Sequence, residues 1–103
     1  MALITFYDTE CNSLDKEGGT IQELAWATFD IDSKRLVYAK SFLLNWNMHY
    51  EVSPDAFEAT GLSKVFCERM GDPAPYVFSI FLDDVSRSQF VGGHNHLEFD
   101  DKI

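Results

Sequence analysis

The pattern of apolar and polar positions first predicts three strands. Residues 3–7 form a short apolar run, which is typical of a buried strand. Residues 20–31 are rich in β-branched and aromatic side chains with apolar groups at both alternating sets of positions, which indicates an interior strand. Turn-forming residues at 32–34 separate this strand from a second β-rich run at 35–44. We therefore expect residues 20–44 to form a hairpin beside the first strand.

The middle of the chain carries the start and stop signals of short helices. Ser53 can act as an N-cap, Pro54 suits the first helical position, and Gly61 can close the helix. Ser63 can cap a second short helix that ends at Gly71. These signals predict two short helices between the hairpin and the next element.

A third helix is predicted to follow, with Asp72–Pro73 opening it. Its apolar side chains recur every three to four residues, which indicates one buried face. The residues of this face are Val77, Phe78, Phe81, Leu82 and Val85. Residues 89–92 then predict a short strand, and residues 97–103 have the pattern of a helix that has barely begun.

This order of elements predicts an α/β fold. Three strands, then helices, a further strand and the start of a helix fit a mixed sheet that combines an antiparallel hairpin with a crossover strand. The chain has 103 residues, 46% hydrophobic and 15% aromatic, which suits one globular domain. Because the last helix has no stop signal and no partner element after it, we expect residues 1–103 to be a single domain that is incomplete at its C-terminal end.

Composition narrows the function classes. A net charge of −9 argues against a basic nucleic-acid-binding surface, but it allows an acidic metal site whose cations hold phosphate. Cys11 and Cys67 make neither a zinc pattern nor a disulfide framework, so we expect two reduced thiols in a cytoplasmic protein. No apolar run approaches the roughly 20 residues that span a membrane, and residues 1–5 lack the basic region of a signal peptide.

Two acidic residues follow the first apolar run. Asp8 and Glu10 are two positions apart, so in a strand their side chains share a face, with Cα atoms roughly 6.6 Å apart. At that range two carboxylates repel by about 2–3 kcal/mol at an effective dielectric of about 20. A hard divalent cation such as Mg²⁺ or Mn²⁺ between them turns this repulsion into attraction. The alternative is two solvated acids at a strand end, and the spacing alone does not decide between them.

Three segments, taken in order, resemble the DEDD-type 3′–5′ exonuclease family, the DnaQ-like and ribonuclease T superfamily with an RNase H-like fold. The first motif of that family is a strand ending in D-x-E, matched here at 8–10. The second is an HN…FD segment, matched by His-Asn at 94–95 and Phe-Asp at 99–100. Between them, residues 54–63 resemble the proline, alanine and Thr-Gly-Leu turn of family members. The resemblance covers essentially the whole chain, but only the front part of the family's domain.

The resemblance implies a two-metal-ion nuclease site. Asp8 and Glu10 would be direct ligands of two Mg²⁺ or Mn²⁺ ions, and Asp100 would hold the second ion. In such a site the ions activate a water and stabilise the leaving oxygen. Cys11 and Asn12 would line the terminal nucleotide, and Leu14 and Phe99 would pack on or beside its base. His94 and Asn95 would shape the turn of the second motif.

The chain also departs from the family pattern. Cys11 stands where a threonine is usual, and the spacing from His94 to Asp100 is one residue longer than the commonest form. The third motif, H-x-x-x-x-D, would supply the general base and a fourth acid. His96 and Asp101 have its spacing, but they overlap the second motif and cannot come from a separate later helix. We therefore expect the third motif to lie outside this chain, and the 103-residue chain alone to be inactive.

The sequence thus predicts a 3′–5′ exonuclease domain that hydrolyses phosphodiester bonds at 3′ ends of single-stranded DNA or RNA. A DNA polymerase or another replication or repair protein is the kind of partner found in the family. The alternative is a non-catalytic RNase H-like interaction or regulatory module, which the acidic charge and the missing third motif favour. The carboxylates at positions 8, 10 and 100 favour the nuclease, because a binding module has no reason to keep repelling acids together. The choice between DNA and RNA, and the oligomeric state, stay open.

Overall fold

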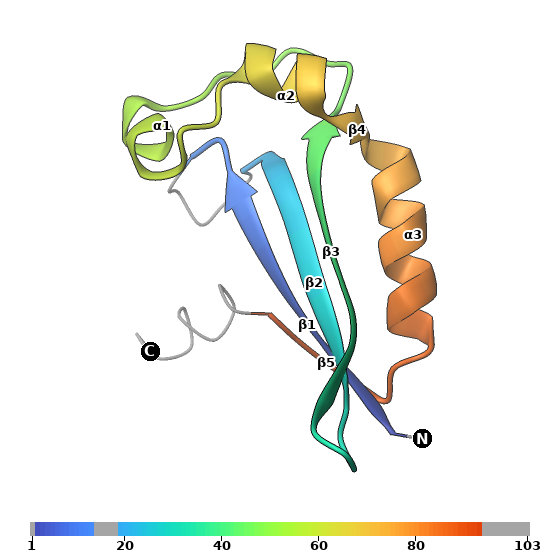
Figure 1. Cartoon of the computed structure of the whole chain (residues 1–103). Helices are drawn as coiled ribbons and strands as arrows, with labels where there is room; N and C mark the ends of the chain where they lie inside the picture. The colour runs from blue at the N-terminus through green and yellow to red at the C-terminus, as the bar shows by residue number, and fades with distance from the viewer. Residues whose placement is uncertain (1, 14–18, 94–103) are drawn as a thin grey trace.

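The computed structural model describes residues 2–13 and 19–93, which form a five-stranded mixed sheet and three helices. The strands are β1 (Leu3–Cys11), β2 (Ile21–Asp30), β3 (Arg35–Asn45), β4 (Asp72–Pro73) and β5 (Phe90–Gly93). The helices are α1 (Pro54–Thr60), α2 (Lys64–Met70) and α3 (Ala74–Ser86). Helices α1 and α2 lie at the end of the sheet where β1 and β3 end, and α3 runs back along the sheet (Figure 1).

The strand order is β4-β3-β2-β1-β5. Strands β1, β2 and β3 pair antiparallel, whereas β5 pairs parallel with β1, and β4 pairs parallel with β3. The mixed α/β sheet and the hairpin predicted at residues 20–44 are confirmed. The predicted end of the first strand was wrong, because β1 continues beyond residue 7 to Cys11. Asp8 and Glu10 therefore lie inside a paired strand, since β2 supplies partners for the whole of that extension.

The caps of the two short helices are those predicted. The Ser53 side chain accepts a hydrogen bond from the Ala56 N–H at 3.1 Å, and Pro54 is the first residue of α1. Gly61 closes α1 with φ of 72°, a left-handed conformation that glycine adopts without strain. The Ser63 side chain accepts from the Phe66 N–H at 3.0 Å at the start of α2. Local sequence signals thus determine both helix starts.

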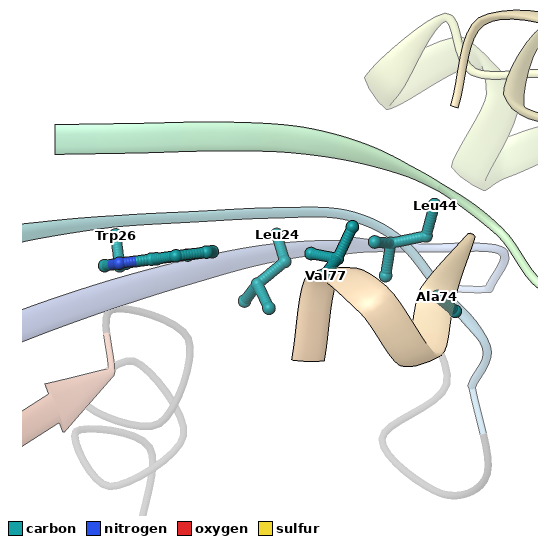
Figure 2. Packing of buried hydrophobic residues seen from close by; sticks show 5 residues of the cluster. All are labelled: Leu24, Trp26, Leu44, Ala74 and Val77. Atoms are coloured by element: carbon teal, nitrogen blue, oxygen red, sulfur yellow. The ribbon is translucent and has the colours of Figure 1, made fainter. Parts of the chain in front are cut away.

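Helix α3 covers one face of the sheet, and the core lies between them. The apolar side chains of this core come from β2, β3 and α3 and interdigitate at close range (Figure 2). They are Leu24, Trp26, Leu44, Ala74 and Val77, and each is at most 2% exposed. The ring of Phe81 packs edge-on against the ring of Trp26, with centroids 5.1 Å apart. Tyr7 on β1 also packs against the Phe81 ring, with centroids 5.6 Å apart. The face of β1 that carries Tyr7 is therefore the face that α3 covers.

The third helix differs from the prediction at its apolar face, whereas its predicted start is confirmed. Pro73 is the N-cap residue of α3, which begins at Ala74 without a side-chain cap hydrogen bond. Asp72 and Pro73 also form β4, which pairs with Leu44 and Asn45. Leu82 is 61% exposed and not part of the buried face. An α-helix turns about 100° per residue, so Leu82 lies about 140° round from Val77 and outside the stripe that meets the sheet.

A buried acid occupies the place on α3 that the apolar pattern did not predict. Asp84 is fully buried, and its carboxylate accepts hydrogen bonds from Trp26 Nε1 at 2.8 Å, Lys40 Nζ at 2.7 Å and Arg87 Nη2 at 2.6 Å. Burial acts to raise the pKa of Asp84, but these donors outweigh it and hold the pKa below its ordinary value. Asp84 therefore joins α3 to β2 and β3 as an ion.

Within the described residues, no helix is both long and apolar enough to cross a membrane. The helix predicted at residues 97–103 lies outside the described residues.

Candidate metal and nucleic-acid site

Strand β1 presents Asp8 and Glu10 on the face of the sheet opposite α3. Side chains alternate along a strand, and Tyr7 points toward Phe81 of α3, so the two acids point the other way. Asp8 is exposed and Glu10 is half-buried. The Asp8 carboxylate accepts a hydrogen bond from the Thr9 N–H at 3.0 Å, which orients one of its oxygens. The pairing of these two acids on one face is the arrangement that the D-x-E spacing predicted.

A third carboxylate faces the pair across the ladder between β1 and β2. Glu23 is the direct partner of Glu10 in this register, and Asp8 is opposite Ala25. Directly opposed residues of an antiparallel pair share a face, so Glu10 and Glu23 are like charges side by side, which destabilises a sheet. The sequence analysis missed Glu23. Its half-buried position alternates with buried neighbours along β2, but only the strand register shows that it meets Glu10.

A shallow depression of about 550 Å³ lies on the sheet beside Asp8. Small side chains of β2 and β3 form part of its lining, and Phe6 stands at its edge with 43% of its surface exposed. These small side chains are Ala25, Ala27, Ala39 and Ser41. The carboxylate pair is thus bordered by an open and largely apolar surface.

The last described residue, Gly93, lies beside the residue that precedes Asp8. Gly93, the last residue of β5, pairs with Tyr7. A Cβ atom at position 93 would lie 2.6–2.9 Å from the Tyr7 ring, so only glycine fits this close approach. The predicted site residues Leu14, His94, Asn95, Phe99 and Asp100 lie outside the described residues.

Cys11 follows the acids at an irregularity in the strand. The ladder between β1 and β2 shifts register between Glu10 and Cys11. Cys11 is half-buried, and burial is the main cause that raises the pKa of its thiol, with the charge of Glu10 acting in the same direction. Without a bound metal ion the thiol is therefore neutral at physiological pH, which makes it a poor nucleophile.

Asn12 comes next, and its side chain is engaged with the main chain on two sides. Its Oδ1 accepts from the Thr20 N–H at 2.6 Å, and its Nδ2 donates to the Glu51 carbonyl oxygen at 2.6 Å. The family resemblance assigned Cys11 and Asn12 to the terminal nucleotide. Cys11 is the last residue of β1, and Asn12 follows it.

The donor set fits part of a site for a hard divalent cation. Carboxylate oxygens are the ligands that Mg²⁺ and Mn²⁺ prefer, and Asp8 and Glu10 offer them from adjacent positions on one face. Within residues 2–13 and 19–93, however, no three His, Cys, Asp or Glu side chains are grouped so as to hold an ion. The pair therefore needs at least one further ligand to complete a metal site.

Comparisons with known proteins place this geometry in a known fold. No protein-family model and no curated protein matches the chain. Among solved structures, exonuclease I of E. coli in complex with an oligonucleotide aligns with a TM-score of 0.81 and 16% identity over 98% of this chain. Exonuclease I of Methylocaldum szegediense aligns with a TM-score of 0.79 and 17% identity over 98% of the chain. A complex of exonuclease I with SSB-Ct gives a TM-score of 0.80 and 17% identity over 97%.

This likeness confirms the RNase H-like α/β fold of the exonuclease type. This chain spans 22% of the length of each of these three exonuclease I chains. At 16–17% identity the likeness concerns the fold, and the activity has to be argued from the residues of the site.

Proposed function

We propose that this chain forms part of a 3′–5′ exonuclease domain in which Asp8 and Glu10 hold divalent cations for hydrolysis of phosphodiester bonds at 3′ ends. The substrate is single-stranded DNA or RNA. The cofactors are two Mg²⁺ or Mn²⁺ ions. The observation that carries this proposal is the pair of carboxylates on one open face of β1, in a fold shared with exonuclease I.

The sheet itself gives a reason for a cation at this place. Glu10 stands directly opposite Glu23, and Asp8 lies two residues before Glu10 on the same face of β1. Negative charge therefore accumulates on one patch of the sheet. Such an arrangement costs folding free energy, because like charges opposite one another destabilise a strand pair. A bound divalent cation offsets that cost, which supports a binding role for these acids.

The roles proposed for the residues are those that the family resemblance implies. Asp8 and Glu10 bind the ions, and Asp100 supplies a further carboxylate from the segment that follows Gly93. Bound ions of this kind activate a water and neutralise the charge of the leaving oxygen. Cys11 lies at the terminal nucleotide, Leu14 and Phe99 pack on its base, and His94 and Asn95 shape the second-motif turn. In the family, a third motif supplies the general base and a fourth acid.

The substrate and partner classes rest on charge and on the neighbours. With a net charge of −9, the chain repels a phosphate backbone unless cations intervene, so substrate binding should require the divalent ions. The exonuclease I neighbour solved with an oligonucleotide supports single-stranded DNA as the substrate, and the one solved with SSB-Ct supports a protein partner. We propose that this partner is a replication or repair protein, such as a DNA polymerase.

The test is cleavage of a 5′-labelled single-stranded oligonucleotide by the full-length protein in Mn²⁺ or Mg²⁺. We expect a ladder of products shortened from the 3′ end. We also expect Asp8→Asn and Glu10→Gln to lower the rate by more than about 100-fold, because outer-shell changes at metal sites alone cost about 10–100-fold. Asp83→Asn is the matched control, since Asp83 is an exposed acid on α3 that is not on this face.

Two results would contradict the proposal. Undiminished cleavage by the Asp8→Asn variant would show that the Asp8 carboxylate is not needed for hydrolysis. A full-length protein that carries the third motif and yet leaves the oligonucleotide intact would instead support the non-catalytic interaction module.

A further inference from the structure

The end of β1 is tied to two other segments through Asn12. Besides the two side-chain bonds to Thr20 and Glu51, its main-chain N–H donates to the Thr20 carbonyl at 2.9 Å. Its own main-chain carbonyl accepts from the Ser53 N–H at 2.9 Å. All four hydrogen-bonding groups of Asn12 thus have a main-chain partner: the main-chain N–H and side-chain oxygen bond to Thr20, just before β2, and the side-chain N–H and main-chain carbonyl bond to the segment just before α1.

We infer that Asn12 is a positioning residue that holds the segment before α1 against the end of β1, two residues from Glu10, instead of acting mainly as a ligand of the nucleotide. The importance of this position for catalysis rests on the proposed function. The structural part of the inference stands on the hydrogen bonds alone.

The bonds of Asn12 reach α1 through a short chain of contacts. Glu51 and Ser53 are two residues apart in the same segment. The side-chain amide of Asn12 bonds to Glu51 and its main-chain carbonyl bonds to Ser53, so Asn12 contacts this segment at two points. Ser53 is the N-cap of α1, and its side chain accepts from the N–H of Ala56, which is fully buried. The orientation of Asn12 is therefore transmitted to the first turn of the helix. Glu10, on the other side of Asn12, is only two residues away along β1.

Asn45 shows that this role is not a general property of asparagines at this end of the sheet. Its Oδ1 accepts from the Asn47 N–H at 3.0 Å, which is a local turn. Its Nδ2 reaches the Glu68 carbonyl at 3.5 Å, at the outer limit of a hydrogen bond. Asn45 therefore serves as the matched control, because the same substitution there removes no strong long-range bond.

The first experiment measures amide hydrogen exchange by NMR in the 103-residue chain. In Asn12→Ala, the Thr20 amide loses its partner Oδ1, and we expect its exchange to accelerate about tenfold, the equivalent of one hydrogen bond. The Ser53 amide bonds to the main-chain carbonyl of residue 12, which alanine keeps. If the Asn12 side chain holds the segment before α1 in place, the Ser53 amide should nevertheless exchange about tenfold faster in Asn12→Ala than in the wild type.

A second variant separates the two side-chain bonds and guards against a fold defect. Asn12→Asp keeps an oxygen for the Thr20 N–H but cannot donate to the Glu51 carbonyl. We expect faster exchange at Ser53 and retained protection at Thr20. Unchanged exchange at Ser53 in both variants would overturn the inference, as would the same acceleration in Asn45→Ala.

The functional experiment uses the full-length protein and a single-stranded oligonucleotide. If Asn12 positions α1 for substrate binding, Asn12→Ala raises KM about tenfold and changes kcat by less than about twofold. A variant that merely lost folded protein would lower kcat and leave KM unchanged. A lower kcat at unchanged KM would therefore count against the positioning role.

The two proposals fail in distinguishable ways. If the wild-type protein cleaves nothing, the proposed function fails, while the exchange rates at Thr20 and Ser53 still decide whether Asn12 holds the segment. If cleavage is normal and the exchange rates do not respond, only the positioning role is lost.

Discussion

The two faces of the sheet treat their polar side chains in opposite ways. On the face that α3 covers, Thr5 and Thr28 are fully buried and share a hydrogen bond of 2.7 Å, and Asp84 has three donors. On the opposite face, Asp8 is exposed, and Glu10 stands across from Glu23. Buried polar groups are mostly hydrogen-bonded, as these three are, whereas the open face keeps like charges together.

This difference separates residues that hold the fold from residues available for function. The charge on Asp84 is matched by Lys40 and Arg87, so its removal should weaken the fold. The charges of Glu10 and Glu23 oppose one another in the ladder, so removing one of them should strengthen the fold. The predictions below use the opposite signs of these effects.

The largest effect is expected at Asp84. We expect Asp84→Asn to lower the free energy of unfolding by about 3 kcal/mol, because it leaves the partly buried Lys40 without its partner. Asp83→Asn is the matched control on the same helix turn, and this exposed site should change stability by less than about 0.5 kcal/mol. Urea denaturation of both variants measures the difference. Equal stabilities would show that the buried network does not hold the covered face.

The same residue predicts a dependence of stability on pH. Since folding lowers the pKa of Asp84, its contribution is fully present above the unfolded value of about 3.9 and is lost as the pH falls through the folded pKa. In Asp84→Asn this part of the acid destabilisation should be absent. Urea midpoints measured from pH 6 down to pH 2 give the comparison, and parallel curves for the two proteins would refute this assignment.

A smaller effect of opposite sign is expected on the open face. Glu23→Gln should raise the free energy of unfolding by about 0.2–1 kcal/mol without metal, because it relieves the repulsion with Glu10. The gain should shrink when Mn²⁺ is added, since the cation already offsets this repulsion in the wild type. Glu51→Gln, in the segment before α1, controls for the overall change of charge. A lower free energy of unfolding in Glu23→Gln would show that repulsion between Glu10 and Glu23 does not destabilise the sheet.

The sequence predicted those features that depend on neighbours along the chain. Ser53, Pro54 and Gly61 define α1 through bonds within a few residues, and the spacing of Asp8 and Glu10 puts them on one face of any strand. These are short-range rules of geometry, so a single sequence is sufficient for them.

The features that were missed depend on contacts far apart in the sequence. Glu23 meets Glu10 only because of the register between β1 and β2, which no local pattern encodes. Asp84 is an acid in an apolar face, and its partner Trp26 is 58 residues away. The bond between Asn12 and Glu51, which spans 39 residues, was likewise not predicted. Tertiary pairing, and not composition, decides the role of each.

The most direct test of the central claim is a titration of the ¹⁵N-labelled chain with Mn²⁺, which broadens the amide NMR signals nearest to the bound ion. The claim predicts that broadening begins at residues 7–11 of β1 and at the facing residues 23–25 of β2, and that Asp8→Asn weakens binding by more than about tenfold. Asp83→Asn should leave the pattern unchanged. Broadening that spreads evenly over the acidic residues of the chain, or that persists at the same Mn²⁺ concentration in Asp8→Asn, would contradict the claim.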